Sequence, residues 1–178
     1  MKLPTLLAVT GLLLSAATVR AVDPQIYFSR SDAVAKVLIR EIDSAQKSVH
    51  VLIYSLTDDD VANALVRAAG RGVDVKVVMD LSQTAEKHSL KEFLTTKLGA
   101  KRVIERTGKG RGIMHEKMAV YDGSTVTLGS YNWTDNARDD NWENLIVLHD
   151  AGLAAKCESE FQRVWSSPPP REPKEKKR

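Results

Sequence analysis

The stretch from Met114 to Asn132, MHEKMAVYDGSTVTLGSYN, constrains the fold more than any other part of the chain. It contains Asp122-Gly123, a pair typical of a two-residue β-hairpin turn, with alternating apolar residues on both sides. Residues that oppose each other in such a hairpin share one face of the sheet. A two-residue loop predicts the cross-strand pairs Tyr121–Ser124, Ala119–Val126, Lys117–Leu128 and His115–Ser130.

This pairing predicts a patch of reactive side chains, which the amide of Asn132 joins two residues after Ser130. Lys117 offers a positive charge with three donors, and Ser130 and Asn132 offer neutral donors. His115 offers a nucleophile or proton carrier that titrates near neutrality. Together they form a binding site for a tetrahedral anion beside a reactive base. The pattern indicates phosphoryl transfer, in which positioning and charge stabilisation supply most of the rate enhancement.

Six residues at fixed spacing in this stretch resemble the signature of the phospholipase D superfamily: His115-x-Lys117-x4-Asp122-x6-Gly129-Ser130-x-Asn132. Glu143, further along, matches the acidic residue that follows this signature. The likeness extends from about Gln25 to Trp165. A single motif behind a secretory signal resembles the small bacterial periplasmic endonucleases of that superfamily.

The resemblance implies a double displacement at phosphorus in which His115 forms a phosphohistidine. A second histidine must protonate the leaving oxygen, and the family supplies it by pairing two motifs. A chain with one motif is therefore expected to form a symmetric homodimer with a composite active site. Lys117 and Asn132 would hold the non-bridging oxygens with support from Ser130, and Glu143 would orient His115.

Asp122 and Gly129 are expected to have structural roles, and the resemblance implies no metal or cofactor. The alternative is a metal site formed by four acidic residues: Asp135, Asp139, Asp140 and Glu143. Their spacing matches no calcium loop. The single cysteine, Cys157, cannot form an intramolecular disulfide, and we expect a small packed residue rather than a catalytic thiol.

The N-terminus reads as a secretory signal peptide over residues 1–21. Lys2 precedes an apolar run from Leu3 to Ala17, and Val19-Arg20-Ala21 is a small-x-small cleavage site. The run is shorter than the roughly 20 residues that a spanning helix needs, so an uncleaved anchor is the weaker alternative. We expect cleavage after Ala21, a periplasmic or secreted product, and no stable insertion in a membrane.

Alternating patterns over residues 22–167 predict one α/β catalytic domain, a layered α/β/α sandwich with a mixed β-sheet. Strands are expected at 26–28, 49–54, 73–81, 102–105 and 145–148, besides the hairpin. Helices are expected at 31–47, 57–70, 84–98 and 152–165, with a polar loop over 133–142. His50, in a doubly buried strand, is expected to be structural.

The net charge of +3 comes from the ends of the chain, because the signal segment and the tail 168–178 are both basic. A broad basic surface is therefore excluded. Basic residues instead gather before the hairpin, as a polyanion guide or, alternatively, a solvated loop: Lys97, Lys101, Arg102, Arg106, Lys109 and Arg111. The proline-rich tail is expected to be disordered, either as a weak hold on a polyanion or as a solubilising end.

Three functions fit these observations. The first is a sequence-nonspecific nuclease for DNA, with RNA as a further substrate, because the site contacts phosphate and no base edge. Possible nucleic-acid contacts are Arg106, Lys109, Arg111 and Trp133. The pair Trp133 and Trp142 is expected either to stack on bases or to pack in the core at the rim of the sheet. The second is a lipid phosphodiesterase, since the same phosphorus chemistry serves both substrates. The third is a non-catalytic nucleic-acid-binding module, which predicts that His115→Asn leaves activity intact.

Overall fold

A seven-stranded mixed sheet organises the protein. The structure, a computed structural model, describes residues 23–110 and 112–170. The strands lie in the order β1 (Gln25–Phe28), β7 (Asn144–His149), β6 (Thr125–Gly129), β5 (Lys117–Tyr121), β2 (Ser48–Ile53), β3 (Asp74–Asp80) and β4 (Val103–Arg106). The neighbours β2, β3 and β4 run parallel, and all other neighbouring pairs are antiparallel.

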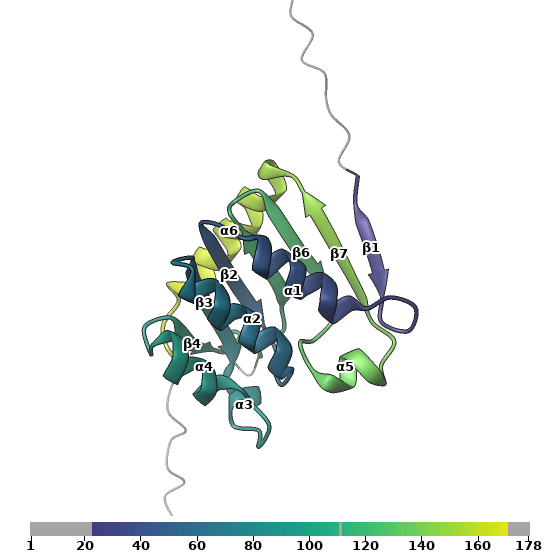
Figure 1. Ribbon diagram of the computed structural model, residues 1–178. Coiled ribbons are helices and arrows are strands. Elements are labelled where there is room, and N and C mark those ends of the chain that lie inside the picture. The colour runs from purple at the N-terminus through teal and green to yellow at the C-terminus, as the bar shows by residue number, and fades with distance from the viewer. Residues whose placement is uncertain (1–22, 111, 171–178) are drawn as a thin grey trace, which may run out of the picture.

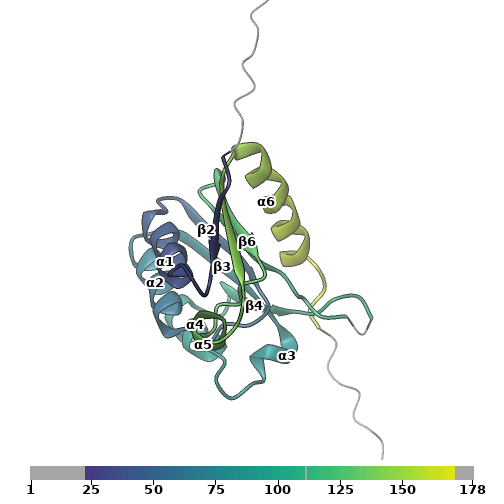
Figure 2. The ribbon, with the colours of Figure 1, turned by 90° about the vertical axis from the view of Figure 1, so that its right-hand side faces the viewer.

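Helices cover both faces of this sheet, as Figures 1 and 2 show. One face packs against α1 (Val34–Ser44), α2 (Asp59–Gly70) and α4 (Lys91–Leu98), and the other against α6 (Ala151–Trp165). Two short helices, α3 (Leu81–Thr84) and α5 (Asp135–Asp139), lie beyond one edge. This arrangement confirms the predicted α/β/α sandwich with a mixed sheet.

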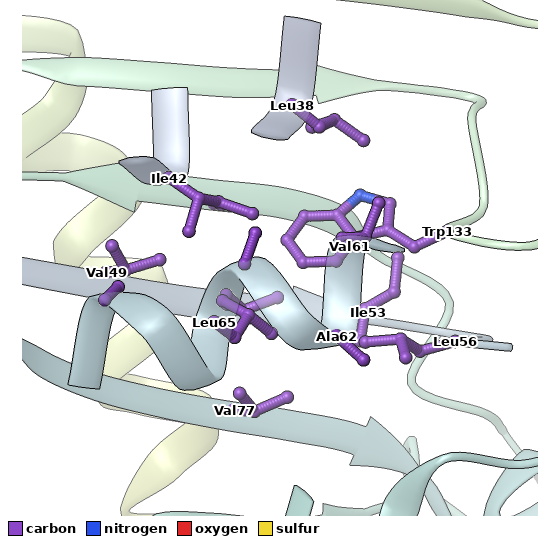
Figure 3. Close-up of a cluster of buried hydrophobic side chains, with 14 of the residues drawn as sticks. Leu38, Ile42, Val49, Ile53, Leu56, Val61, Ala62, Leu65, Val77 and Trp133 are labelled. Carbon is purple, nitrogen blue, oxygen red and sulfur yellow. The ribbon is translucent and has the colours of Figure 1, made fainter. Parts of the chain in front are cut away.

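Trp133 belongs to the core and not to the surface, so its predicted contact with nucleic acid is wrong. Its side chain is 1% exposed, and Figure 3 shows the indole among Leu38, Ile53 and Val61. The backbone N–H of Trp133 donates to the carbonyl of Ser55 at 3.1 Å. Burial of the large apolar surface of a tryptophan is favourable, and this gain decides the position of Trp133 although the residues after it are polar.

Helix boundaries differ from the prediction in three places. The expected helix 84–98 is reduced to α4 and preceded by α3, because the backbone N–H of Leu90 is hydrogen-bonded to the distant carbonyl of Leu56 at 3.2 Å. The first helix starts at Val34, not near Ser31. The loop 133–142 contains the five-residue helix α5, which is too short for periodicity to reveal.

The hairpin register is shifted by one residue from the predicted one. Tyr121 pairs with Thr125, so the loop has three residues and Ser124 is unpaired in the ladder. Ala119 therefore faces Thr127, not Val126. The shift places Val126 and Leu128 on the face covered by α6, where burying them is favourable. His115 accordingly lies before β5, outside the ladder, and does not oppose Ser130.

Asp122 anchors the hairpin turn to the start of β2, as its expected structural role requires. Its carboxylate accepts the backbone N–H groups of Gln46, Lys47 and Ser48 at 2.7–3.1 Å. Partial burial acts to raise the pKa of Asp122, but these donors outweigh it and the pKa is lowered. Asp122 and Gly123 both have positive φ, 53° and 66°.

His50 is a satisfied structural histidine, as predicted. Its side chain is 8% exposed and stacks on Phe161 of α6 with ring centroids 4.6 Å apart. Its Nδ1 lies 2.8 Å from a carboxylate oxygen of Glu158. In residues 23–110 and 112–170, no helix is long and apolar enough to cross a membrane. The predicted signal peptide and most of the predicted tail lie outside the described residues.

Candidate active site

The residues predicted to carry the chemistry meet at one edge of the sheet. This edge is formed by the carboxyl ends of β2, β3, β4, β6 and β1 and by the amino ends of β5 and β7. In open α/β sheets, ligands bind at the carboxyl ends of the parallel strands. Asp122 lies at the opposite end of β5, so the hairpin turn is remote from this edge.

His115 is exposed and is held from the side by Tyr54, a residue that the sequence analysis missed. The two rings meet edge to face with centroids 4.6 Å apart and planes inclined at 63°. Tyr54 follows β2 directly, and its N–H donates to the carbonyl of Glu116 at 2.8 Å. Lys117 Nζ lies 4.8 Å from the centre of the same tyrosine ring. Tyr54 therefore contacts both groups of the motif.

Lys117 is half-buried at the start of β5. Its Nζ donates to the carbonyl of His115 at 2.9 Å. Partial burial lowers the pKa of Lys117, and the negative charge of Glu143 opposes this effect. The ammonium thus lies within electrostatic reach of the predicted acidic residue.

Ser130 and Glu143 form a hydrogen-bonded pair at the ends of β6 and β7. The hydroxyl of Ser130 donates to the Glu143 carboxylate at 2.5 Å and accepts the N–H of Asn144 at 3.1 Å. Asn141 donates to the other carboxylate oxygen at 3.2 Å. Within the described residues, Glu143 makes no hydrogen bond to His115, so its predicted orienting role is not seen in a single chain.

Gly129 gives Ser130 room to reach this position. A Cβ at residue 129 would lie 2.3 Å from the carbonyl oxygen of Asn144, far inside van der Waals contact. The close approach of β6 to β7 at this point therefore needs glycine. This steric requirement is the structural role predicted for Gly129.

Asn132 follows in the segment that leaves β6. Its side-chain oxygen is buried without a hydrogen-bond partner in the described part of the chain. The neighbouring Trp133 is fixed by main-chain bonds to residues 55, 57 and 58. The backbone next to Asn132 is therefore held in place by main-chain hydrogen bonds.

Asp80 is a second residue that the sequence analysis missed. It is fully buried at the end of β3, and its Oδ2 accepts the N–H of Met114 at 2.7 Å. Its Oδ1 accepts the N–H and hydroxyl of Ser82 at 2.9 and 2.5 Å. Asp80 thus fixes the residue that immediately precedes His115. A buried acid ending an apolar strand was the available signal.

A groove of about 910 Å³ leads away from His115, between the loop 107–116 and the end of α6. Lys109 lines it, whereas Arg111 lies outside the described residues. The guanidinium of Arg106 donates to the carbonyls of Val164 and Trp165 at 3.2 and 2.6 Å, so this arginine ties α6 to β4. Its contact with nucleic acid stays a prediction.

The acidic residues weighed as metal ligands have other partners. Asp135 and Asp139 pair with Arg138 at 2.7 and 3.2 Å, and Arg138 also reaches the buried Asp58 at 3.0 Å. These ion pairs fix α5 against the start of α2. In residues 23–110 and 112–170, no group of three or more histidine, cysteine, aspartate or glutamate side chains is placed to hold a metal ion.

Comparison with known proteins agrees with this geometry. The family described as "Cardiolipin synthase, PLD-like domain" matches residues 38–165. Two solved structures superpose well: NucT from Helicobacter pylori (TM-score 0.75, 31% identity, covering 83% of this chain and 98% of that one) and Nuc from Salmonella typhimurium, a phospholipase D family member (0.72, 30%, 82% and 95%).

Curated relatives carry two kinds of name. A "Phospholipase D" of Rickettsia bellii is 34% identical over 128 residues, covering 71% of this chain and 61% of the relative. A "Mitochondrial cardiolipin hydrolase" of Xenopus tropicalis is 29% identical over 160 residues, covering 84% and 73%. The chain thus spans about three fifths of the Rickettsia protein.

Fold and site define a phosphodiesterase-type α/β protein with one histidine–lysine motif. The chain belongs to the phospholipase D-like family. This assignment confirms the family and the fold class predicted from the motif.

Proposed function

We propose that this protein is a metal-independent phosphodiesterase, a sequence-nonspecific endonuclease that hydrolyses DNA, with RNA as a further substrate. One observation carries the proposal: an exposed imidazole, a half-buried ammonium and the Ser130–Glu143 pair meet at one edge of the sheet. His115 supplies a nucleophile, and Lys117 supplies the charge that stabilises the transition state.

The proposed reaction has two displacements. A neutral ring nitrogen of His115 attacks phosphorus, the bond to the leaving oxygen breaks, and a second imidazole protonates that oxygen. The same second imidazole then takes a proton from water, which attacks phosphorus and releases His115. Lys117 and Asn132 hold the non-bridging oxygens, and Ser130 supports them.

The second imidazole is proposed to be His115 of the partner subunit in a two-fold symmetric homodimer. The other histidines have different surroundings. His50 is hydrogen-bonded to Glu158 under α6, and His149 to Thr125 at the opposite end of the sheet. His88 lies on the exposed connection between α3 and α4. In such a dimer, we propose that Glu143 orients an imidazole across the interface.

Nucleic acid is favoured as substrate because the single motif behind a predicted secretory signal resembles the small bacterial periplasmic endonucleases of the superfamily. NucT and Nuc, two structures of similarly small proteins, agree with this resemblance, since the chain covers 98% and 95% of them. The site also presents donors for phosphate without a pocket built for one base, which fits cleavage without sequence preference. The adjoining groove is lined by Lys109 and Arg163 and also by Glu116 and Glu160, so its charge does not decide between substrates.

A lipid phosphodiesterase is the second candidate, and the names of the Rickettsia and Xenopus relatives favour it. The same attack at phosphorus would then release a lipid headgroup. Cardiolipin vesicles are the substrate that distinguishes this candidate from the nuclease.

The test is cleavage of plasmid DNA by the purified chain in excess EDTA, with His115→Asn as the matched variant. We expect degradation that persists in chelator and is abolished in the variant. Intact plasmid and intact RNA with the unmodified chain, across pH and at low salt, would overturn the nuclease proposal. Cleavage that survives His115→Asn would overturn the histidine mechanism.

A further inference from the structure

Trp142 and Arg30 form an exposed pair beside the candidate site. Trp142 is 84% exposed, more than any other large hydrophobic side chain in the described part of the chain. The guanidinium carbon of Arg30 lies 5.5 Å from the centre of its ring, within the range of a cation–π contact. An exposed indole with a guanidinium over its ring offers a ligand an apolar face and a positive charge side by side.

The pair is held in place by Ser29. The Ser29 hydroxyl donates to the carbonyl of Asn141 at 2.6 Å and accepts the N–H of Glu143 at 2.9 Å. The Ser29 N–H donates to the Glu143 carbonyl at 3.1 Å. Ser29 precedes Arg30 in the chain, and its partners Asn141 and Glu143 flank Trp142. These three bonds therefore hold the Arg30 side chain next to the Trp142 side chain.

Arg30 carries a positive charge that no carboxylate neutralises within residues 23–110 and 112–170. Its Nη1 donates to two main-chain carbonyls, those of Asp139 and Asp140, at 3.2 and 3.3 Å. By contrast, Arg67 and Arg163 are each paired with a carboxylate. A fixed guanidinium with neutral partners retains its attraction for an anion.

The pair is continuous with the candidate site through Glu143. The main chain of Glu143 is bound by Ser29, and its side chain is bound by Ser130. A polymer whose phosphate lies against Lys117 and Ser130 can therefore extend over Trp142 and Arg30. An aromatic face beside a cation matches the two repeating parts of a nucleic-acid strand, a base and a phosphate.

We propose that Trp142 and Arg30 form a nucleotide-binding subsite for single-stranded nucleic acid. The indole stacks on the base of a nucleotide flanking the scissile phosphate, and the guanidinium binds a neighbouring phosphate. This subsite rests on the proposed nuclease function and extends it, because it favours unpaired strands, whose bases are free to stack. Stacking tolerates any base, so cleavage stays independent of sequence.

The test uses the full chain with Trp142→Leu, Trp142→Phe and Arg30→Gln. Substrates are a single-stranded DNA oligonucleotide, the same length with abasic sugars, and bis(4-nitrophenyl) phosphate. Trp142→Leu should raise KM for the intact oligonucleotide about tenfold, with kcat and small-diester hydrolysis unchanged. Trp142→Phe should restore most of the affinity. Arg30→Gln should weaken binding of both oligonucleotides and lower the salt dependence.

The abasic substrate separates stacking from other roles of the tryptophan. On it, Trp142→Leu and the unmodified chain should have the same KM. An equal defect on abasic and intact strands would overturn base stacking. A defect seen only with cardiolipin vesicles would instead assign the pair to a membrane surface. If the unmodified chain cleaves no nucleic acid, the proposed function falls first, and the subsite with it.

Discussion

The pKa of Lys117 depends on its surroundings at the edge of the sheet. Partial burial lowers the pKa of Lys117, so the amine loses its proton at lower pH than an ordinary lysine with a pKa of 10.5. The neutral amine cannot stabilise phosphate charge. Hydrolysis of a small diester should therefore fall on the alkaline side as pH rises through this lowered pKa, and a pH profile of kcat/KM measures the effect.

Lys117→Arg is the matched variant for that profile, because arginine stays charged throughout the accessible range. The alkaline fall should move upward in pH or disappear, with some loss of rate from the altered geometry. Lys117→Gln should lose about 10²- to 10³-fold in kcat at all pH values. An alkaline limb that is identical in the arginine variant would show that another group is responsible.

Asp80 is predicted to position the residue before His115. An amide offers one acceptor oxygen where the carboxylate offers two, so in Asp80→Asn either Met114 or Ser82 loses its acceptor. We expect a loss of about 2 kcal/mol in the free energy of unfolding and roughly a tenfold fall in kcat, with KM unchanged. Urea unfolding and steady-state kinetics measure the two effects.

Ser82→Ala is the control for Asp80, since it removes the hydroxyl donor and leaves the Met114 contact in place. Its kcat should stay close to that of the unmodified chain. A folded Asp80→Asn protein with full kcat would contradict a positioning role.

At the residue scale, motif spacing predicted which side chains gather, because His115, Lys117, Ser130 and Glu143 do lie at one edge. It could not predict Tyr54 or Asp80, since both reach the motif from strands that are distant in sequence. The sequence also left both Trp133 and Trp142 undecided between base stacking and core packing. The neighbours of a tryptophan depend on tertiary packing, which a local polar sequence does not encode.

Among the elements, the β5–β6 hairpin depends on the anchor that Asp122 provides. The lowered pKa of Asp122 means that its stabilising effect is present above the ordinary aspartate pKa and is lost as pH falls through the lowered value. Asp122→Asn should cost about 2 kcal/mol in the free energy of unfolding at pH 7. The difference should shrink towards pH 3, and urea unfolding at both pH values checks it.

Asn should retain the turn conformation at residue 122, because asparagine tolerates positive φ. The Asp122→Asn comparison therefore isolates the carboxylate. A destabilisation of equal size at both pH values would contradict the role given to its charge.

The sequence predicted which helices and strands are present more reliably than it predicted the register of strand pairing. Apolar periodicity predicted the strands of the described residues and the helices α1, α2 and α6, because all of these except β1, whose apolar side chains are largely exposed, have buried apolar residues at regular spacing. The hairpin register failed because the turn signal alone favoured a two-residue loop, whereas burial of Val126 and Leu128 under α6 sets the pairing. The start of the helix predicted at 84–98 failed because Leu90 bonds to Leu56.

At the scale of the whole molecule, the proposed composite site makes activity depend on pairs of chains. Random mixing of unmodified chains with an equal amount of His115→Asn chains leaves about a quarter of the dimers fully intact. If both imidazoles serve one site, the activity of the mixture should be about a quarter of that of the same total amount of unmodified chain. An activity of about one half would mean that each chain is sufficient by itself.

In the proposed reaction, His115 becomes covalently attached to phosphorus. The most direct measurement is mass spectrometry of the protein after rapid mixing with a short DNA substrate in EDTA and quenching in alkaline denaturant. We expect a transient adduct with the mass of one phosphorylated fragment, located on His115 and absent from His115→Asn. Cleavage that proceeds at full rate without any adduct on His115 at any mixing time would contradict it.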